Sequence, residues 1–351
     1  MNKIRVINKA IIENHLTMVD AIEAVKHAYI LNSSKEITLF DTVFYEFEEN
    51  KADMDIKSGT IDKAGIFGFK LMSWFGDNES KGLDTLMGNI MLYDRQTGAP
   101  IALLDGTSIT GMRTGAAGGI GSHYLARHNS QKMLMIGTGN QAPYQIASHL
   151  ILMDQINEIM VYNPRSYKKA EDFCRNIKST LYTSFLDQFN HDPQVYHQLV
   201  KKYDVTFTPV EKLDESVYSA DIIVTATPSK KPLIKKDWLR LGTHLTCIGA
   251  DMPGKQEIDE NIFAISRVFV DDIDKTSKTG EMEMAIQLGT FKKEDIVGEI
   301  GEVILGKKLG RTSDEDITIF DATGLAAQDM LSAKLLYDKA EKHNIGVTIE
   351  L

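Results

Sequence analysis

Short apolar segments alternate with helix-compatible stretches through the middle of the chain. Five of these segments are rich in Val, Ile, Leu and Met without polar alternation: residues 132–136, 158–162, 221–226, 244–248 and 267–270. Unbroken apolar runs of this length are typical of parallel strands that are covered on both faces. The alternation of such strands with helices predicts an α/β fold with a Rossmann-type, doubly wound sheet.

The regions on either side follow a different pattern. Residues 43–49, 66–74 and 88–93 are predicted strands joined by short connections. Near the other end of the chain, residues 328–342 carry apolar side chains at helical spacing, which indicates an amphipathic helix. We expect this helix to pack on the N-terminal region, so that both ends of the chain belong to one α+β domain.

These patterns divide the chain into two predicted domains. Residues 1–125 with 320–351 form the discontinuous α+β domain, and residues 126–319 form the Rossmann-type domain. Residues 179–205 separate two strands of the second domain and contain several aromatic side chains. This segment is either an added helical pair or a mobile excursion.

Composition and charge exclude several classes of protein. The formal net charge of −10 argues against nucleic acid or an anionic membrane as a partner. No apolar run approaches the roughly 20 residues that a membrane-spanning helix needs. The two cysteines, Cys174 and Cys247, cannot form a disulfide framework, which favours a reducing, cytoplasmic location. The histidines are scattered without a close pair of ligands, so no metal site is expected.

A candidate dinucleotide site follows the first predicted strand of the Rossmann-type domain. The strand runs directly into Gly137 and Gly139, which are separated by one residue, and then into a helix-compatible stretch through Asn140 and Gln141. Glycines at such a turn let the backbone approach a pyrophosphate, and the N–H groups at the helix start favour an anion. We therefore expect Gly137, Gly139, Asn140 and Gln141 to bind the coenzyme phosphates.

The end of the second predicted strand bears on the choice of coenzyme. An acidic side chain usually accepts from the ribose 2′-hydroxyl of NAD at this position, but here the chain has Asn163 with Arg165 two residues later. A neutral amide with a guanidinium suits a 2′-phosphate, so NADP(H) is favoured and NAD(H) remains possible. The alternative is that these residues form only a turn and a helix cap. Thr225 and Thr227, at the end of the predicted strand at 221–226, are further candidates for coenzyme contacts.

Four motifs in order resemble the ornithine cyclodeaminase/μ-crystallin family. They are residues 106–117 with 124–127, 249–259, 298–303 with 310–313, and 317–326. Within that family, the sequences of residues 227–232 and 249–251 are most similar to those of the archaeal-type alanine dehydrogenases. The resemblance covers most of the chain from about residue 86 onward.

The resemblance implies an enzyme and a homodimer. In this family the N-terminal domain supplies the dimer interface and much of the substrate pocket, and the second domain binds NAD(P), with Thr114 here among the implied coenzyme-binding residues. Members transfer hydride at the α-carbon of an amino or imino acid, as amino acid dehydrogenases or imine reductases. The alternatives are an ornithine cyclodeaminase, which forms proline and ammonia, and a non-catalytic, μ-crystallin-like binding protein.

Three residues match the positions that hold substrate or catalyse the reaction in this family. Lys70 lies inside an apolar predicted strand, where burial would lower its pKa and suit it to act as an acid or to polarise the substrate. Arg113 lies among small residues, and its guanidinium suits the bidentate binding of an α-carboxylate. Asp251 follows a strand at the carboxyl edge, where a carboxylate can accept the substrate's proton and stabilise an iminium. The alternatives are an edge-strand lysine, a structural salt bridge and a turn aspartate, respectively.

The predicted substrate region departs from the family in two places. Thr42 stands where members usually have a basic residue that helps to bind the carboxylate. Residues 57–59 replace the usual Met-Pro-Ala, which suggests that Lys57 supplies the missing charge. The alternative is that Lys57 lies in a surface turn. We therefore expect the class of reaction to be better defined by the sequence than the identity of the substrate.

Overall fold

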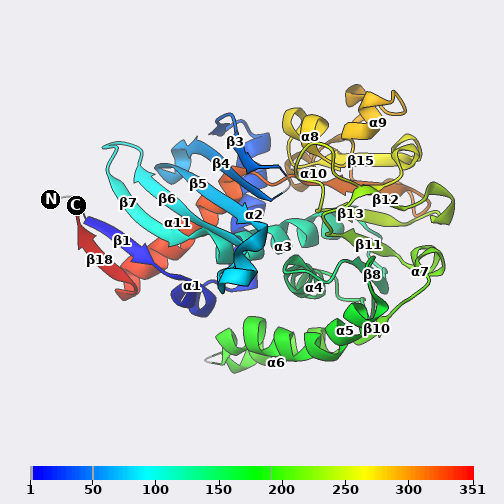
Figure 1. Ribbon diagram of the computed structural model, residues 1–351, viewed down its shortest axis with the longest axis horizontal. Helices are drawn as coiled ribbons and strands as arrows, with labels where there is room; N and C mark the ends of the chain where they lie inside the picture. The colour runs from blue at the N-terminus through cyan, green and yellow to red at the C-terminus, as the bar shows by residue number, and fades with distance from the viewer. Residues whose placement is uncertain (1–2, 50, 191) are drawn as a thin grey trace. The chain divides into compact units, whose positions relative to one another are not determined.

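The computed structural model describes residues 3–49, 51–190 and 192–351, which fold into two compact units. Unit 1 contains the chain up to Arg113 together with Leu325–Leu351, and unit 2 contains Thr114–Gly324. The blue and red ends of the chain are therefore parts of the same unit (Figure 1). The sequence pattern placed the boundaries at residues 125 and 320, whereas the first observed boundary lies inside a helix, α3 (Gly106–Leu125).

Unit 1 is built on a mostly antiparallel sheet. Its strands are β1 (Lys3–Ile7), β2 (Ile37–Leu39), β3 (Val43–Glu48), β4 (Ala52–Ile61), β5 (Ile66–Phe75), β6 (Leu86–Asp94), β7 (Pro100–Asp105) and β18 (Val347–Glu350). They lie in the order β18-β1-β7-β6-β5-β4-β2, and β3 also pairs with β4. Neighbouring strands are antiparallel except β1 and β7. The predicted strands at 43–49, 66–74 and 88–93 correspond to β3, β5 and β6.

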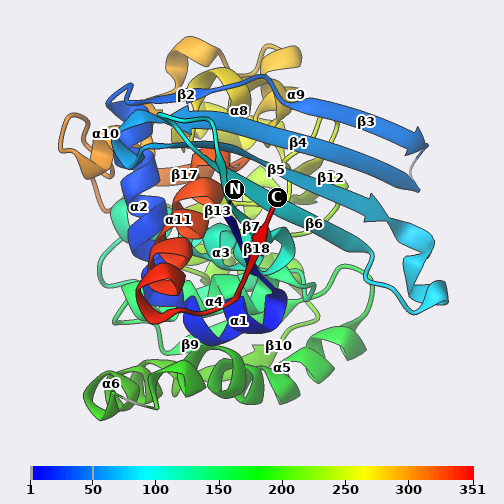
Figure 2. The same ribbon diagram turned by 90° about the vertical axis from the view of Figure 1, so that its left-hand side faces the viewer.

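Helices cover one face of this sheet. They are α1 (Lys9–His15), α2 (Met18–Ser33) and α11 (Ala326–His343). The buried residues of α11 include a stripe at helical spacing, Ser332, Ala333, Leu336 and Ala340, which packs on α2 and on β4, β5 and β6. Figure 2 shows α2 and α11 side by side. The predicted amphipathic helix at 328–342 is thus α11, and it packs on the N-terminal part of the chain as expected.

Unit 2 is an α/β domain on a parallel sheet. Its strands are β8 (Lys132–Ile136), β9 (Glu158–Tyr162), β10 (Thr206–Pro209), β11 (Ile222–Thr225), β12 (Lys230–Ile234), β13 (His244–Cys247), β14 (Gln256–Ile258), β15 (Ser266–Val270), β16 (Gly298–Glu299) and β17 (Ile317–Asp321). The main sheet has the order β10-β9-β8-β11-β13-β17-β15-β16, and β12 and β14 form a separate parallel pair. The strand order reverses at β8 and β11, which is the arrangement of a doubly wound dinucleotide-binding fold. The predicted fold class is confirmed.

Helices flank the parallel sheet and bury its apolar strands. Besides the rest of α3, they are α4 (Gln141–Leu152), α5 (Tyr167–Leu181), α6 (Pro193–Tyr203), α7 (Leu213–Ser219), α8 (Ile273–Thr279), α9 (Glu283–Gln287) and α10 (Ile300–Ile304). The small residues of α3 allow close packing on α4. A Cβ atom at Gly115 would lie 2.6 Å from the carbonyl oxygen of Tyr144, and one at Gly119 would lie 2.7 Å from the hydroxyl of Ser148.

The segment at 179–205 is helical, with residue 191 outside the described residues. After α5 the chain makes a π-helical turn at Tyr182–Leu186, and α6 then begins at Pro193 with Asp192 as its N-cap. Phe185, Leu199 and Tyr203 are buried. Of the two alternatives for this segment, the structure has the added helices.

Within the described ranges, the helices are too short or too polar to cross a lipid bilayer.

Candidate active site

Lys70 lies at the centre of a buried cluster in unit 1. Side chains alternate along β5, and the face that carries Lys70 is the one on which α11 packs. Only 2% of Lys70 is exposed. Its Nζ donates to Asp329 Oδ1 at 3.0 Å and to Thr110 Oγ1 at 3.2 Å. The alternative of an exposed edge-strand lysine is therefore wrong.

Arg113 meets the same carboxylate from α3. Its Nε donates to Asp329 Oδ1 at 3.0 Å, and Nη1 donates to Gln328 Oε1 at 3.3 Å. Asp329 is fully buried. One of its carboxylate oxygens, Oδ1, is shared by the two cations. The structural salt bridge considered for Arg113 is present, and it is made to the residue that also binds Lys70.

The charges in this cluster are unequal. Burial, followed by the charge of Arg113, lowers the pKa of Lys70 to about 8. Burial opposes the ionisation of Asp329, but Arg113 and Lys70 outweigh it, and the pKa of Asp329 lies below its ordinary value. With Lys70 protonated, two cations face one anion. The cluster is therefore electrostatically suited to bind an additional carboxylate.

Lys57 adds a third cation to the same face of the sheet. It lies within β4 directly opposite Lys70 in the antiparallel pair, so the two side chains project to one side. Its charge lowers the pKa of both Lys70 and Asp329, which places it near the cluster. Residues 57–59 are thus part of a strand and not of a surface turn.

The glycine turn of unit 2 is shaped for a dinucleotide. Gly137 has a φ of +112°, and a Cβ there would lie 2.6 Å from the carbonyl oxygen of Ala226. The side-chain position of Gly139 is open space, and α4 starts two residues later, at Gln141. Asn140 occupies the N-cap position without a side-chain hydrogen bond, so the N-terminal N–H groups of α4 are not capped by it. Open space beside the N-terminus of α4 fits a pyrophosphate.

Asn163 ties the end of β9 to this turn. Its Nδ2 donates to Thr138 Oγ1 at 2.7 Å, and its Oδ1 accepts from the backbone N–H groups of Arg165 and Ser166 at 2.9 and 3.1 Å. The turn considered as an alternative is thus present, and the side chain of Arg165 is exposed beyond it. Such an arrangement is compatible with a role of both residues at the coenzyme ribose.

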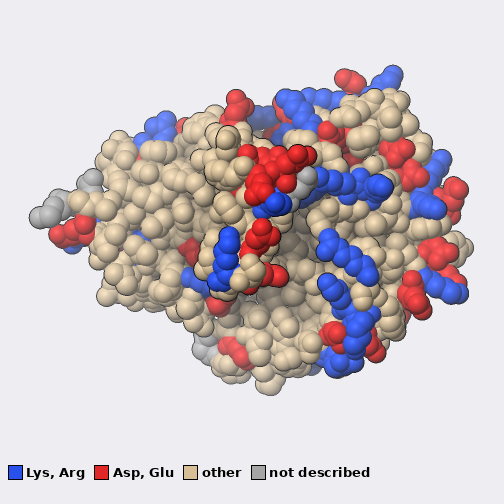
Figure 3. All heavy atoms as spheres, viewed as in Figure 1, with Lys and Arg blue, Asp and Glu red and all other residues tan. Residues whose placement is uncertain are grey.

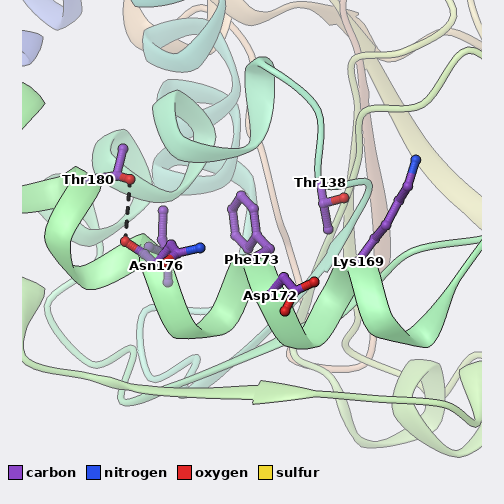
Figure 4. A pocket seen from close by; sticks show the side chains of 7 residues that line it. Thr138, Lys169, Asp172, Phe173, Asn176 and Thr180 are labelled. Carbon is purple, nitrogen blue, oxygen red and sulfur yellow. Dashed lines mark hydrogen bonds between the residues drawn. The ribbon is translucent and has the colours of Figure 1, made fainter.

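A hollow of about 320 Å³ adjoins the glycine turn. It is lined by Thr138 and by one side of α5, including Lys169, Phe173 and Asn176. In the close-up, Thr138 and Lys169 lie at the same end of the row of labelled side chains (Figure 4). On the face shown in Figure 3, Lys and Arg side chains gather over α5 and the adjoining part of unit 2. Positive charge therefore lies beside the proposed phosphate-binding turn.

Asp251 lies in the loop after β13 in unit 2. Its side chain is 45% exposed, and Oδ1 accepts from Lys255 Nζ at 2.6 Å. Asp251 and Lys255 thus form an ion pair within this loop.

The three predicted threonines lie in different surroundings. Thr225 is fully buried within β11, whereas Thr227 lies in the loop that follows and donates its backbone N–H to Glu257. The carbonyl of Thr114 accepts from Gln145 Nε2 at 2.9 Å, which ties α3 to α4. Of the three, Thr227 is the one that lies in a loop at the carboxyl edge of the sheet.

The sequence reasoning missed two acidic residues, Asp329 and Glu257. Asp329 lies on α11, three residues before the buried Ser332 and four before the buried Ala333. A carboxylate on the buried stripe of a helix is a signal for a buried cation, and it could have been recognised. Glu257 lies within the motif at 249–259, but nothing in the pattern indicated that it would be buried. Among the described residues, no group of three or more His, Cys, Asp or Glu side chains could hold a metal ion.

Fold and site together define a two-domain protein that binds a dinucleotide in one unit and has a buried cationic cluster in the other. The sequence profile of the "Ornithine cyclodeaminase/mu-crystallin family" matches residues 3–184 and 189–344. The chain belongs to this family.

Individual relatives extend over nearly the whole chain. An alanine dehydrogenase of Archaeoglobus fulgidus is 36% identical over 341 residues, which cover 97% of this chain and 96% of the relative. The structure of an archaeal alanine dehydrogenase dimer with bound NAD matches with a TM-score of 0.86 at 35% identity and covers 99% of both chains. The Δ1-pyrroline-2-carboxylate reductase of Thermococcus litoralis, in complex with NADH and L-proline, matches with a TM-score of 0.86 at 28% identity, covering 99% of this chain and 100% of the other.

Proposed function

We propose that this enzyme is a nicotinamide-dependent oxidoreductase that acts at the α-carbon of an amino or imino acid. The observation that carries the proposal is the buried cluster of Lys70, Arg113 and Asp329, in which two cations share one carboxylate. This excess of positive charge suits a substrate carboxylate, and the glycine turn of unit 2 suits the coenzyme. The names of the relatives support the reaction class, since they include an amino acid dehydrogenase and an imine reductase.

We propose a separate role for each residue of the site. Lys70 and Arg113 bind the α-carboxylate of the substrate, and Lys57 supplies the charge that Thr42 does not. Asp251 accepts a proton from the substrate nitrogen and stabilises the positive charge that develops there. The nicotinamide, when bound, supplies the redox chemistry.

The finer identity of the coenzyme is also a proposal. We propose that NADP(H) binds more tightly than NAD(H), with Arg165 and Lys169 contacting the 2′-phosphate. The exposed position of Arg165 and the place of Lys169 in the hollow beside Thr138 support this. Asn163 contributes no negative charge that would repel the phosphate.

Assembly and location complete the proposal. We propose a homodimer, supported by the exposed apolar side chains of β3. The free thiols Cys174 and Cys247 support a reducing, cytoplasmic location.

A panel assay tests the proposed function. The purified protein is incubated with α-amino acids in one series and with α-keto acids plus ammonia or amines in another, each with NAD(H) and NADP(H), while nicotinamide absorbance and free ammonia are followed. Proline and pipecolate are included among the products that are analysed. A net change in absorbance is expected for at least one substrate. Ammonia release without a net change in absorbance would instead identify a cyclodeaminase. The absence of both signals with every substrate would contradict the proposal.

A further inference from the structure

Glu257, on β14, joins two loops at the carboxyl edge of the unit 2 sheet. Its side chain is fully buried. Oε1 accepts the backbone N–H of Thr227 at 2.7 Å, and Oε2 accepts the backbone N–H of Gly249 at 3.0 Å. Thr227 follows β11 and Gly249 follows β13, so a single carboxylate fixes the loops that leave two adjacent strands.

The two loops are also packed closely against each other. A Cβ atom at Gly249 would lie 2.3 Å from the carbonyl oxygen of Thr227 and 2.4 Å from Glu257 Oε2. On the other side, Ala226 is close enough to the glycine turn to exclude a Cβ at Gly137. The loop after β11 therefore begins beside the glycine turn.

Two further buried acids lie near Glu257, and one of them, Glu281, binds its backbone. Glu281 Oε1 accepts from the backbone N–H groups of Glu257 and Ile258, both at 2.6 Å. Asp321, at the end of β17, accepts from the N–H of Met282 at 3.0 Å. Each of the three acids accepts at least one hydrogen bond from a backbone N–H group. Together they fix the backbone near the carboxyl ends of the strands.

Burial opposes the ionisation of all three acids. Burial raises the pKa of Glu257 to about 7, although the N–H groups that it accepts favour its ionised form. The groups that face it are Glu281, Asp321 and Cys247, and burial raises the pKa of each well above its ordinary value. Asp271 adds negative charge near Asp321. A pKa of about 7 means that Glu257 changes charge near neutral pH.

We propose that Glu257 is a positioning residue that, as a carboxylate, holds the loops after β11 and β13 in the arrangement that binds the nicotinamide half of the coenzyme. This inference rests on the proposed function. In doubly wound folds the pyrophosphate lies at the first glycine turn, and the rest of the dinucleotide extends across the carboxyl ends of the strands beyond the switch point. Here those strands are β11 and β13, whose loops Glu257 joins.

Protonation of Glu257 weakens this connection. An ionised carboxylate accepts hydrogen bonds at both oxygens, whereas a protonated one carries an O–H on one of them and holds only one N–H group well. One loop then loses its charge-assisted hydrogen bond. The affinity for NADH therefore rises as the pH increases through about 7. The affinity for ADP-ribose, which lacks the nicotinamide ring, stays constant over the same range.

The experiment compares the affinities of NADH and ADP-ribose for three proteins between pH 6 and 8: unmodified, Glu257→Gln and Asp221→Asn. The amide of Glu257→Gln retains one acceptor and directs N–H groups at a backbone donor. Asp221 is the matched control, because it accepts from the backbone N–H groups of Gln131 and Lys132 at 2.8 and 3.0 Å but lies at the amino edge of the same sheet.

Glu257→Gln is expected to lower NADH affinity about tenfold or more at pH 8, to abolish the pH dependence and to leave ADP-ribose affinity unchanged. Asp221→Asn is expected to keep both the ratio of the two affinities and its pH dependence. A Glu257→Gln protein with an unchanged ratio would overturn the inference.

The unmodified protein decides the matter if Glu257→Gln does not fold. An NADH affinity that rises through pH 7 relative to the ADP-ribose affinity supports the inference. A ratio of the two affinities that is constant with pH overturns the inference but not the proposed function. Absence of both NADH and NADPH binding at every pH would overturn the proposed function as well.

Discussion

Asp329 is the residue on which the cationic cluster depends. It is fully buried and accepts from Lys70 and Arg113 through the same oxygen. Without it, two cations would be buried side by side with no counter-charge. A buried ion pair is a weak source of net stability, but removing one partner is strongly destabilising.

Replacement of Asp329 by asparagine is expected to lower the free energy of unfolding by about 3 kcal/mol or more, because both cations lose their partner. Urea denaturation measures the change. The folded-state pKa of Asp329 lies below its ordinary value, so its contribution is present above that ordinary value and is lost as the pH falls through the lower, folded pKa.

Asp338→Asn is the control, on the same helix. Asp338 is 57% exposed and pairs with Lys334, so its loss should cost about 0.5 kcal/mol or less. Equal losses for the two variants would contradict the account of the cluster.

Lys70 and Asp329 show what sequence reasoning can reach at this scale. A lysine in an apolar strand is conspicuous, and its burial and lowered pKa were expected and are confirmed. The place of Asp329 on the buried stripe of α11 signals a buried cation but does not say which one. Its partners lie on strands and helices more than 200 positions away in the sequence, which a local pattern does not reveal.

At the scale of elements, α5 presents two adjacent lysines in different settings. Lys168 pairs with Glu171 and Asp172 at 2.8 and 2.9 Å, whereas Lys169 lines the hollow beside Thr138. Neighbouring residues on a helix point in different directions, so only one of the two faces the glycine turn.

NADPH is expected to bind more tightly than NADH, since Arg165 and Lys169 can pair with the 2′-phosphate. Arg165→Ala and Lys169→Ala should each weaken NADPH about tenfold while NADH changes little. Fluorescence titration of each reduced coenzyme measures this. Lys168→Ala is the control and should alter neither affinity. Equal NADPH affinity in the unmodified protein and in Arg165→Ala would defeat the NADP(H) proposal.

One strand that the sequence analysis did not predict is β4, which carries polar residues. β4 contains Asp53, Asp55 and Lys57 at alternate positions, all on the face that bears Lys70 in the adjacent strand. A strand whose inward face is polar lacks the apolar pattern on which prediction rests. Local rules fail most often where a protein binds something, and the failure at β4 coincides with the proposed substrate face.

At the scale of the molecule, β3 presents an apolar surface. All its residues are exposed, and Val43, Tyr45 and Phe47 lie on it at alternate positions. The Tyr45 and Phe47 rings are 5.1 Å apart, and Phe47 lies 5.7 Å from the ring of Phe75. Contiguous exposed aromatic rings are typical of a surface that a partner covers.

The chain is expected to elute as a homodimer, with about twice the mass of the 39.2 kDa chain. Tyr45→Asp should shift it toward the monomer, because a charge would be buried in the apolar interface. Light scattering coupled to size-exclusion chromatography measures the mass. Tyr218→Asp is the control, since Tyr218 is an exposed tyrosine of unit 2. A monomeric unmodified protein at every concentration would contradict the dimer.

The architecture of the whole chain was largely predictable. Apolar parallel strands such as β8 and β13 have unbroken patterns, and the predicted Rossmann-type fold is confirmed. The domain boundaries at 125 and 320 stay a prediction. The helix α3 is uninterrupted, and it begins in unit 1 and ends in unit 2. No change of pattern marks a boundary inside a helix.

The central claim is that hydrogen passes from the α-carbon of an amino acid to a nicotinamide, with Asp251 assisting. Its most direct test follows one deuterium atom. Amino acids deuterated at the α-carbon, L-alanine and L-proline among them, are incubated with oxidised coenzyme, and the mass of the coenzyme is measured. Deuterium is predicted in the coenzyme with the unmodified protein and not with Asp251→Asn, which should still bind the coenzyme. A coenzyme free of deuterium with every amino acid, or equal transfer by Asp251→Asn, would contradict the claim.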